Sequence, residues 1–308
     1  MKIVLLDAIT FGDTKLECFK KFGEVVIYQK TSFDETKQRV LDADVIVTNK
    51  VVISKEIMEQ CKNLKLICVA ATGMNNVDLK AAKEMNIEVK NVAGYSTASV
   101  IQHTFSMLFY LIGHSKYYDD VTKSATYSHS DVFTDVSHPF FEIKGKKWGI
   151  IGLGEIGRGV AKVAECFGAK VCYYSTSQKN INRDYMQTDL QTLLQTCDII
   201  SIHAPLNEQT KNLLDYDELM QCKDGAVLLN LGRGGIVNED AIAQIIDERN
   251  ISFGLDVFEE EPFLSYTPLL KVRNKERLYL TPHIAWTSKE ARAKLIEGVC
   301  NNIAEIVK

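Results

Sequence analysis

The sequence predicts an α/β protein with two domains, each built around a doubly wound parallel sheet, and three observations support this prediction. Short apolar runs alternate with amphipathic helical patterns from the first residue onward, which is typical of βα units around a parallel sheet. The 308 residues exceed the usual size of a single hydrophobic core. Three glycines at the spacing G-x-G-x-x-G, within residues 152–157, follow an apolar run near the middle of the chain. A whole domain's worth of chain therefore precedes this glycine fingerprint.

The first part of the chain is predicted to form a flavodoxin-like domain. Its short apolar runs are separated by segments with charged faces at 34–41, 54–61 and 78–85, and Asp78 is placed to cap the last of these. This part contains no glycine fingerprint. The predicted strands are residues 3–6, 25–28, 45–48, 66–69 and 87–91.

A long helix is expected after the first sheet. Ser96, Thr97 or Ser99 can cap it, and apolar residues between Val100 and Ile112 line one broad face. The pattern is long enough to bridge two domains. Residues 124–139 are polar and irregular and are expected to form an exposed connection.

The second alternation is predicted to be a Rossmann-like domain, and it leaves only one helix, residues 288–307, at the end of the chain. A lone helix cannot form a domain, so we expect it to cross back and make the first domain discontinuous. The prediction is a substrate domain of residues 1–98 plus 283–308 and a dinucleotide-binding domain of residues 99–282. The predicted strands of the second domain are residues 148–151, 170–174, 198–202, 226–230, 252–256 and 277–280.

Composition limits the classes of function. A net charge of −4 argues against a dedicated nucleic-acid surface. No apolar stretch approaches the ~20 residues of a membrane span. The eight cysteines are scattered without a C-x-x-C pair or clustered partners, so no metal site is expected. The chain starts directly in a strand-like run, and a reducing, cytoplasmic compartment is the expectation.

The glycine fingerprint has the chemistry of a dinucleotide site. Gly152 allows the tight turn, Gly154 lets the backbone approach a pyrophosphate, and Gly157 lets the helix pack on the strand. Amides at the helix start then face the negative charge. The alternative is a glycine-rich turn that binds nothing, but the strand, the helix and six βα units around the motif favour binding.

The second strand of this domain ends without the acidic residue that would hold the ribose 2′-hydroxyl of NAD. Ser175 stands near that position, with Lys179 and Arg183 further on. Hydroxyl groups with a nearby cation can accept a 2′-phosphate, whereas a carboxylate repels it. The cofactor is therefore NAD or NADP, and the sequence leaves the choice open.

Three later strand ends carry groups suited to reduction of a 2-keto acid. Arg233 lies between glycines, an acidic run occupies 259–261, and His283 follows the last strand. Since carboxyl ends of strands line the ligand crevice, the three are expected to converge there. They supply a cation for the carboxylate and carbonyl, a proton donor, and an anion that favours the charged imidazole. Taken singly, each of these groups is equally consistent with a structural role in a loop.

These motifs together resemble the D-isomer-specific 2-hydroxyacid dehydrogenases over essentially the whole chain. The resemblance implies that Arg233 orients the substrate, that Glu261 pairs with His283, and that His283 exchanges the proton. Spacing alone does not choose Glu261 over Glu259 or Glu260. The residues that carry the match are 152–157, His203-Ala204-Pro205-Leu206 with Thr210, 230–234, 256–262 and 282–286.

The same resemblance implies a set of cofactor contacts. Asp256 is expected near the nicotinamide carboxamide, and Thr97 near a phosphate. The full set of implied cofactor residues is Thr97, Gly152, Gly154, Glu155, Ile156, Gly157, Ser175, His203, Ala204, Pro205, Thr210, Leu231, Gly232, Asp256 and Ala285.

Motifs around residues 48–50, 71–78, 94–100 and 282–286 are similar to the glycerate dehydrogenase and hydroxypyruvate reductase branch. The implied reactions are hydroxypyruvate/D-glycerate or glyoxylate/glycolate interconversion, in a cleft between the domains. The alternatives are another 2-keto acid, or a dinucleotide-sensing protein of the corepressor kind. The implied substrate residues are Lys50, Thr72, Gly73, Arg233, His283 and Trp286.

Two further expectations come from the helix after Ser96. By family analogy a homodimer is expected, through this helix and the 115–140 segment. Gln102-His103 occupies the commonly acidic position of the helix and is interpreted as packing. The histidines at 114, 129 and 138 receive the same structural interpretation.

Overall fold

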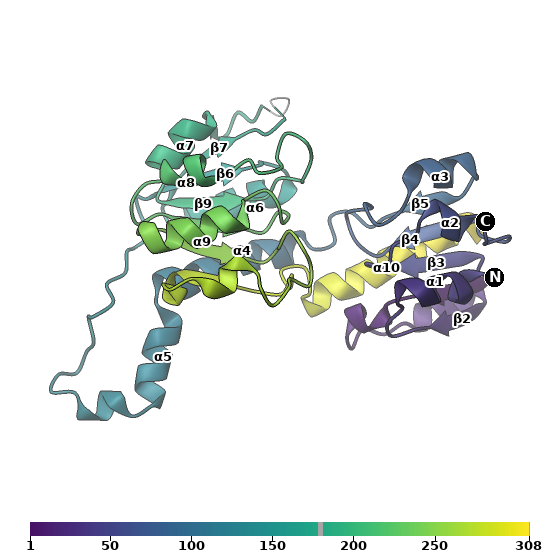
Figure 1. Ribbon diagram of the computed structural model, residues 1–308, viewed down its shortest axis with the longest axis horizontal. Coiled ribbons are helices and arrows are strands. Elements are labelled where there is room, and N and C mark those ends of the chain that lie inside the picture. The colour runs from purple at the N-terminus through teal and green to yellow at the C-terminus, as the bar shows by residue number, and fades with distance from the viewer. Residues whose placement is uncertain (178–180, 308) are drawn as a thin grey trace. The chain divides into compact units, whose positions relative to one another are not determined.

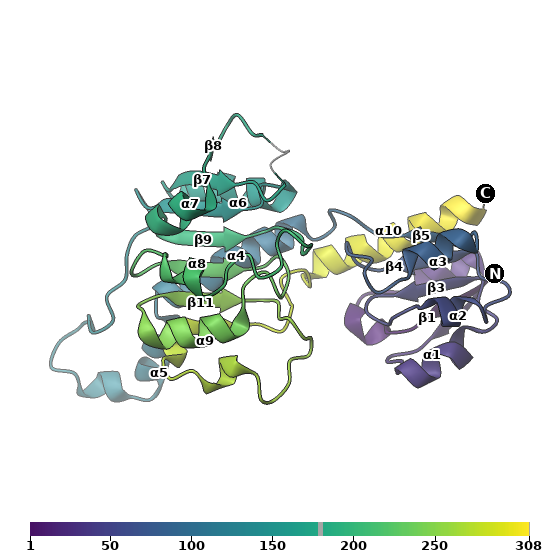
Figure 2. The same cartoon turned by 45° about the horizontal axis from the view of Figure 1, so that its top comes forward.

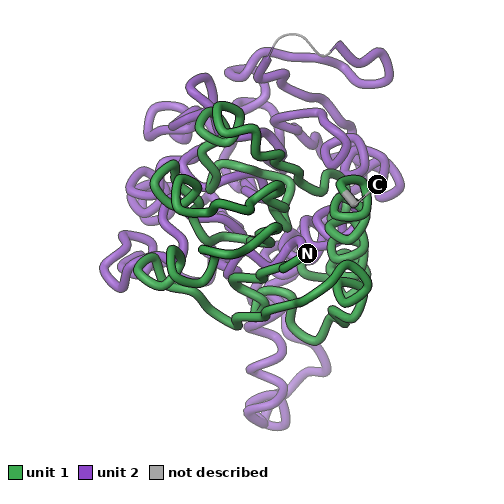
Figure 3. The backbone as a smooth tube through the Cα atoms, turned by 90° about the vertical axis from the view of Figure 1, so that its right-hand side faces the viewer, with its two compact units in different colours: residues 1–96, 287–308 green, residues 97–286 purple. Residues whose placement is uncertain are grey.

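The computed structural model describes residues 1–177 and 181–307. It divides into two compact units, which Figure 3 distinguishes by colour. Unit 1 consists of Met1–Ser96 with Thr287–Lys308, and unit 2 of Thr97–Trp286. The boundaries lie within a few residues of the predicted ones. The main difference is that residues 283–286 belong to unit 2.

Unit 1 is a five-stranded parallel sheet with the order β2-β1-β3-β4-β5, the order of flavodoxin-like folds. The strands are β1 (Lys2–Leu5), β2 (Glu24–Ile27), β3 (Val45–Thr48), β4 (Leu66–Val69) and β5 (Glu88–Lys90). The short helices α1 (Phe33–Val40), α2 (Lys55–Met58) and α3 (Leu79–Glu84) share an apolar core with the sheet. All five predicted strands are present. The inner strands β1, β3 and β4 are almost wholly buried and are therefore continuous apolar runs, whereas the edge strands β2 and β5 are partly exposed.

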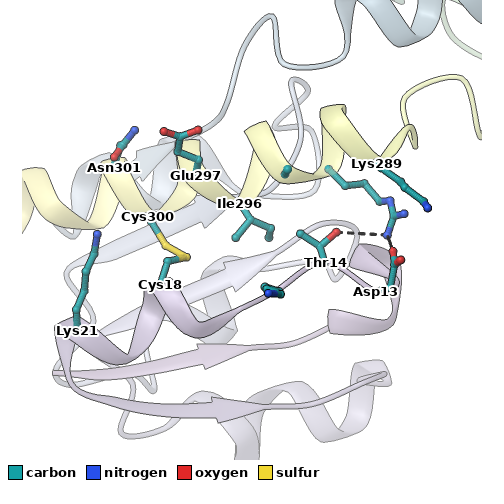
Figure 4. A pocket seen from close by; sticks show the side chains of 12 residues that line it. Asp13, Thr14, Cys18, Lys21, Lys289, Ile296, Glu297, Cys300 and Asn301 are labelled. Carbon is teal, nitrogen blue, oxygen red and sulfur yellow. Dashed lines mark hydrogen bonds and ion pairs between the residues drawn. A yellow bond between two sulfur atoms is a disulfide. The ribbon is translucent and has the colours of Figure 1, made fainter.

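The C-terminal helix α10 (Lys289–Val307) packs on β4 and on the 3₁₀ turn η2 (Glu17–Phe22). The chain's last helix therefore completes the first unit. A disulfide between Cys18 and Cys300 joins η2 to α10 beside a shallow hollow, as Figure 4 shows. Another 3₁₀ turn, η1 (Ala8–Phe11), precedes η2. No local pattern predicts this pairing, since the two cysteines are separated by 282 residues.

Unit 2 contains a seven-stranded parallel sheet with the order β12-β11-β10-β9-β6-β7-β8. The order reverses between β6 and β9, which is where such sheets bind ligands. The sequence predicted six strands and missed β8, because two exposed residues carry no periodicity. The strands are β6 (Lys147–Ile151), β7 (Lys170–Tyr174), β8 (Met186–Gln187), β9 (Ile199–Ile202), β10 (Val227–Asn230), β11 (Ser252–Leu255) and β12 (Leu278–Leu280).

Helices cover both faces of this sheet, as Figure 2 shows. One face packs against α4 (Thr97–Ile112) and α6 (Glu155–Cys166), around the buried Trp148. The other packs against α7 (Leu190–Thr196), α8 (Tyr216–Met220) and α9 (Glu239–Glu248). The 3₁₀ turns η4 (Pro268–Lys271) and η5 (Lys275–Arg277) precede β12.

A segment after α4 extends away from the sheet of unit 2 (Figure 1). It contains α5 (Ser115–Lys123) and the 3₁₀ turn η3 (Thr126–His129), and then the irregular connection that the sequence predicted. No residue of α5 or η3 is buried. Among residues 1–177 and 181–307, no helix is both long and apolar enough to cross a membrane.

Candidate active site

The three glycines after β6 make different contacts, each suited to a dinucleotide loop. Gly152 has a φ of +92°, and a Cβ there would lie 2.8 Å from the backbone nitrogen of Ala204. A Cβ at Gly157 would lie 2.4 Å from the Gly152 carbonyl oxygen, so helix and turn pack closely. A Cβ at Gly154 would meet nothing within 4 Å. The middle glycine therefore leaves open space at the start of α6, where an anion can approach the amides.

Neighbouring residues complete the shape of this loop. Glu155 is the first residue of α6, and its carboxylate accepts a hydrogen bond of 3.0 Å from the Thr97 hydroxyl. Ile156 is partly buried and packs on the core between α4 and α6. Ser175 lies buried directly after β7, while Arg183 is exposed. Lys179 lies outside the described residues.

The loop after β9 carries a histidine with unused hydrogen-bonding capacity. His203 as a whole is only partly buried, but both ring nitrogens are shielded from solvent and have no partner among the described residues. Ala204 is buried, and the Pro205 carbonyl accepts a bond of 2.7 Å from Thr210. Thr210 is fully buried and also accepts from the amide of Asn207, so within this unit it holds the turn together.

His203 predicts a pH dependence of stability. Burial lowers the pKa of its imidazole to about 3, against about 6.5 in an unfolded chain. Between these values the unfolded state binds a proton that the folded state does not, so the free energy of unfolding falls as the pH falls. The expected loss from this group is about 2 kcal/mol between pH 7 and pH 5.

Urea unfolding of the wild type and of His203→Phe at both pH values measures this contribution. The variant keeps a ring of similar size without the titrating nitrogens and should lose about 2 kcal/mol less than the wild type. Equal losses in both proteins would show that His203 is not the group that titrates.

Three adjacent strands, β10, β11 and β12, carry the predicted catalytic groups at their carboxyl ends. Leu231, directly after β10, is buried. Gly232 is closely packed, because a Cβ there would lie 2.7 Å from the Ala204 carbonyl oxygen. The Arg233 carbonyl accepts a bond of 2.9 Å from the Asn230 side-chain amide. The Arg233 guanidinium donates to the Gly232 carbonyl at 2.8 Å.

An imidazole and a carboxylate meet at the ends of β11 and β12. Oε2 of Glu261 lies 2.6 Å from Nδ1 of His283, and Oε1 accepts from the amide of Phe258 at 3.0 Å. Glu259, Glu260 and Glu261 are all exposed as whole residues, and the contact with His283 is made by Glu261. Because a carboxylate only accepts hydrogen bonds, Nδ1 carries the hydrogen that it donates to Glu261, and the other ring nitrogen, Nε2, is left for a substrate.

The turn that carries His283 is held by a buried carboxylate. Asp256, which is 1% exposed, accepts hydrogen bonds from the amides of Ile284 at 2.8 Å and Ala285 at 3.0 Å. The Ala285 carbonyl in turn accepts from the Ser99 hydroxyl of α4 at 2.6 Å. These bonds explain why residues 283–286 belong to unit 2.

The predicted substrate residues of unit 1 follow neighbouring strands. Lys50 is exposed after β3, and its amide donates to the carboxylate of Asp7 at 2.7 Å. Thr72 and Gly73 follow β4, and the Thr72 carbonyl accepts from the side chain of Asn91 at 2.6 Å.

Sequence reasoning missed several residues of these sites. Asp7 ends the first strand run and binds the amides of residues 49–51. Burial raises the pKa of the Asp7 carboxyl, while those amides lower it. The position of Asp7 directly after an apolar strand is the sequence signal that could have indicated it. His103 was interpreted as packing, but its Nε2 lies 3.1 Å from the Thr281 hydroxyl. No sequence spacing indicates that contact.

Comparisons with known proteins agree with this architecture. Residues 105–285 match the family described as the D-isomer specific 2-hydroxyacid dehydrogenase, NAD binding domain. A hydroxypyruvate reductase of Blautia hydrogenotrophica is 34% identical over 318 residues, covering 100% of this chain and 97% of the relative. A glycerate dehydrogenase of Methylorubrum extorquens is 33% identical over 308 residues, covering 99% of this chain and 96% of the relative.

A solved structure of an acyclic imino acid reductase in complex with NADPH and D-Arg has a TM-score of 0.86 to this chain at 28% identity. The match covers 100% of this chain and 97% of that one. Since the family match spans more than half of the chain and the relatives align over nearly all of it, the chain belongs to the D-isomer-specific 2-hydroxyacid dehydrogenases, in the glycerate dehydrogenase and hydroxypyruvate reductase-like branch, and is an NAD(P)-dependent oxidoreductase.

Proposed function

We propose that this chain reduces a small 2-keto acid, with hydroxypyruvate and glyoxylate as the first candidates and D-glycerate and glycolate as the products. The observation that carries the proposal is the 2.6 Å contact between His283 and Glu261 at the carboxyl edge of the sheet that bears the glycine loop. The names of the relatives, among them glyoxylate reductases, support the choice of substrates.

The residues of unit 2 fit a nicotinamide dinucleotide. The open space at Gly154 admits a pyrophosphate. The ring nitrogens of His203, which have no partner within residues 1–177 and 181–307, lie in the loop after β9, across the switch point of the sheet. When bound, the reduced nicotinamide supplies the hydride that converts the keto carbon to a hydroxyl-bearing carbon. Glu155, Ile156, Leu231, Gly232 and Asp256 border the same edge and are proposed as further cofactor contacts.

The chain's own residues supply the proton and the charge. His283 gives a proton from Nε2 to the carbonyl oxygen, while Glu261 on Nδ1 holds the ring orientation. The Arg233 guanidinium is proposed to polarise the carbonyl and to bind the carboxylate. Lys50, Thr72 and Gly73 are proposed to contribute to carboxylate binding, and the partly buried Trp286 to limit substrate size.

A steady-state assay tests the proposal. Hydroxypyruvate, glyoxylate and pyruvate are each offered with NADH and with NADPH, and loss of the reduced nicotinamide absorbance is followed. The expected turnover with one of the first two acids is on the order of 1–10³ s⁻¹. Preference for pyruvate would assign another 2-keto acid to the site. No turnover with any pair would favour a dinucleotide-sensing protein.

The same assay resolves the cofactor. No acid follows β7, and Ser175 is buried there, so the ribose-binding corner lacks the carboxylate that repels a 2′-phosphate. We therefore expect NADPH to be accepted, with a KM within about tenfold of that for NADH. Exclusion of NADPH would show that other residues of this corner select NAD.

We also propose a homodimer formed through α4 and the 115–140 segment. That segment exposes several large apolar side chains, including Phe133, which is 89% exposed, and Val136, which is 79% exposed. Exposed apolar groups of this kind mark protein interfaces. Light scattering after size exclusion should give twice the chain mass, and Phe133→Ser with Val136→Ser should shift the mass toward the monomer. A monomeric wild type at micromolar concentration would rule the proposal out.

A further inference from the structure

Three side chains from three elements of unit 2 meet behind the catalytic turn. His103 comes from α4, Asp256 follows β11, and Thr281 follows β12. The Thr281 hydroxyl lies 2.7 Å from Oδ1 of Asp256 and 3.1 Å from Nε2 of His103. Asp256 and Thr281 are 1% and 5% exposed, so water does not compete for these bonds.

The direction of each hydrogen bond follows from the groups involved. A carboxylate only accepts, so the single hydrogen of the Thr281 hydroxyl points to Asp256. Thr281 Oγ1 must then accept from His103, which places the ring hydrogen on Nε2. Burial lowers the pKa of the His103 imidazole and the nearby Asp256 charge raises it, with burial the larger effect. His103 is therefore the donor at the start of a short chain of hydrogen bonds, and its Nε2 also lies 3.5 Å from Oδ1 of Asp256.

That chain ends on the backbone that presents the proton donor. The Asp256 carboxylate binds the amides of Ile284 and Ala285, the two residues directly after His283. His283 itself has a φ of +52°, a left-handed conformation that non-glycine residues adopt only when their surroundings impose it. The Asp256 carboxylate therefore holds the backbone that presents His283, while Glu261 contacts its ring.

We propose that His103 is a positioning residue for the reduction, acting through Thr281 and Asp256 to hold His283 in its reactive orientation. This proposal rests on the proposed function, since it assigns His283 as the proton donor. His103 does not contact the reacting atoms. Its hydrogen bond holds Thr281 against Asp256, and Asp256 holds the turn that carries His283.

The test combines substitutions at both ends of the chain. His103→Leu removes the donor, and Thr281→Val removes the hydroxyl at nearly constant shape. Each should lower kcat roughly tenfold, with the KM for the keto acid changed less than about twofold. His103→Gln, whose amide can donate to Thr281, and Thr281→Ser should retain most of the turnover. The double variant should be no worse than the poorer single variant, because both changes break the same chain.

Two further variants separate positioning from general damage. Thr104 is the next residue of α4; it is fully buried, and its hydroxyl donates to the Val100 carbonyl of its own helix. Thr104→Val is the matched control and should keep wild-type kcat. In a His283→Ala background, His103→Leu should lower the residual turnover no further, because the residue that it positions is gone. A further tenfold loss in that background would overturn the proposal.

A second readout does not depend on turnover. In protein with labelled histidine, the ring signals of His283 are identified by their loss in His283→Ala. His103→Leu and Thr281→Val should shift those signals, and Thr104→Val should leave them in place. Absence of wild-type turnover with every substrate pair would reject the proposed function, whereas unshifted His283 signals in His103→Leu would reject the positioning role by itself.

Discussion

Replacement of His283 with alanine should lower turnover by a factor on the order of 10²–10⁴, the range that a positioned proton donor contributes. The imidazole is the group at the carboxyl edge that pairs with Glu261 and can pass a proton to a carbonyl oxygen. Without it, water must supply the proton as the hydride arrives. The kcat for keto acid reduction measures the loss, and fluorescence titration with the reduced cofactor measures binding, which should survive.

Two comparisons make this result specific. His129→Ala alters an exposed histidine of η3 and should leave kcat unchanged. Glu261→Gln keeps a hydrogen-bond acceptor but removes the charge, so its kcat should fall between those of the wild type and His283→Ala. Wild-type turnover in His283→Ala would remove His283 from the mechanism. Loss of cofactor binding together with turnover would assign it a structural role.

The buried strands could be predicted from the sequence because they have a strong local signal. A strand of a parallel sheet is covered on both faces, so runs such as 45–48 and 66–69 are continuously apolar. The edge strand β8 has two exposed residues and no such run. The turns η1 and η2 occupy the first βα connection, where no helical periodicity was found.

The site could be predicted only where motifs are contiguous. The glycine loop has a local pattern, but the choice among Glu259, Glu260 and Glu261 depended on family resemblance. The carboxylate beside His283 belongs to the last of the three. Asp7, His103 and Thr281 act through tertiary contacts with distant residues. Hydrophobic periodicity assigns the partly buried His103 to packing because it describes one helix at a time.

The domain boundary predicted at residue 283 lies at residue 287 in the structure, again because of a contact between distant residues. The last apolar strand ends at Leu280, so the sequence suggested that the following turn starts the return to the first domain. The Asp256 carboxylate instead holds residues 284 and 285 against the end of β11. This tertiary contact of Asp256, which no local sequence pattern indicates, keeps residues 283–286 in unit 2.

Substitution of valine for Gly154 should abolish tight cofactor binding while leaving the free protein folded. Gly154 has a φ of −74°, which a valine can adopt, and a Cβ there would meet nothing within 4 Å. The added methyl groups would occupy the space through which a pyrophosphate reaches the amides at the start of α6. Because hydrogen bonds to charged groups contribute about 1.5–3 kcal/mol each, the expected loss of cofactor affinity is on the order of 10–100-fold.

Gly157→Val is the matched contrast at the third glycine of the same loop. A Cβ there would lie 2.4 Å from the Gly152 carbonyl oxygen, so this variant should lose folding stability before any cofactor is added. Thermal unfolding of the free proteins and titration with NADH and NADPH distinguish the two effects. Gly154→Val should unfold within a few degrees of the wild type and bind poorly. Wild-type affinity in Gly154→Val would mean that the dinucleotide does not approach the chain at this turn, and the assignment of the glycine loop would fail.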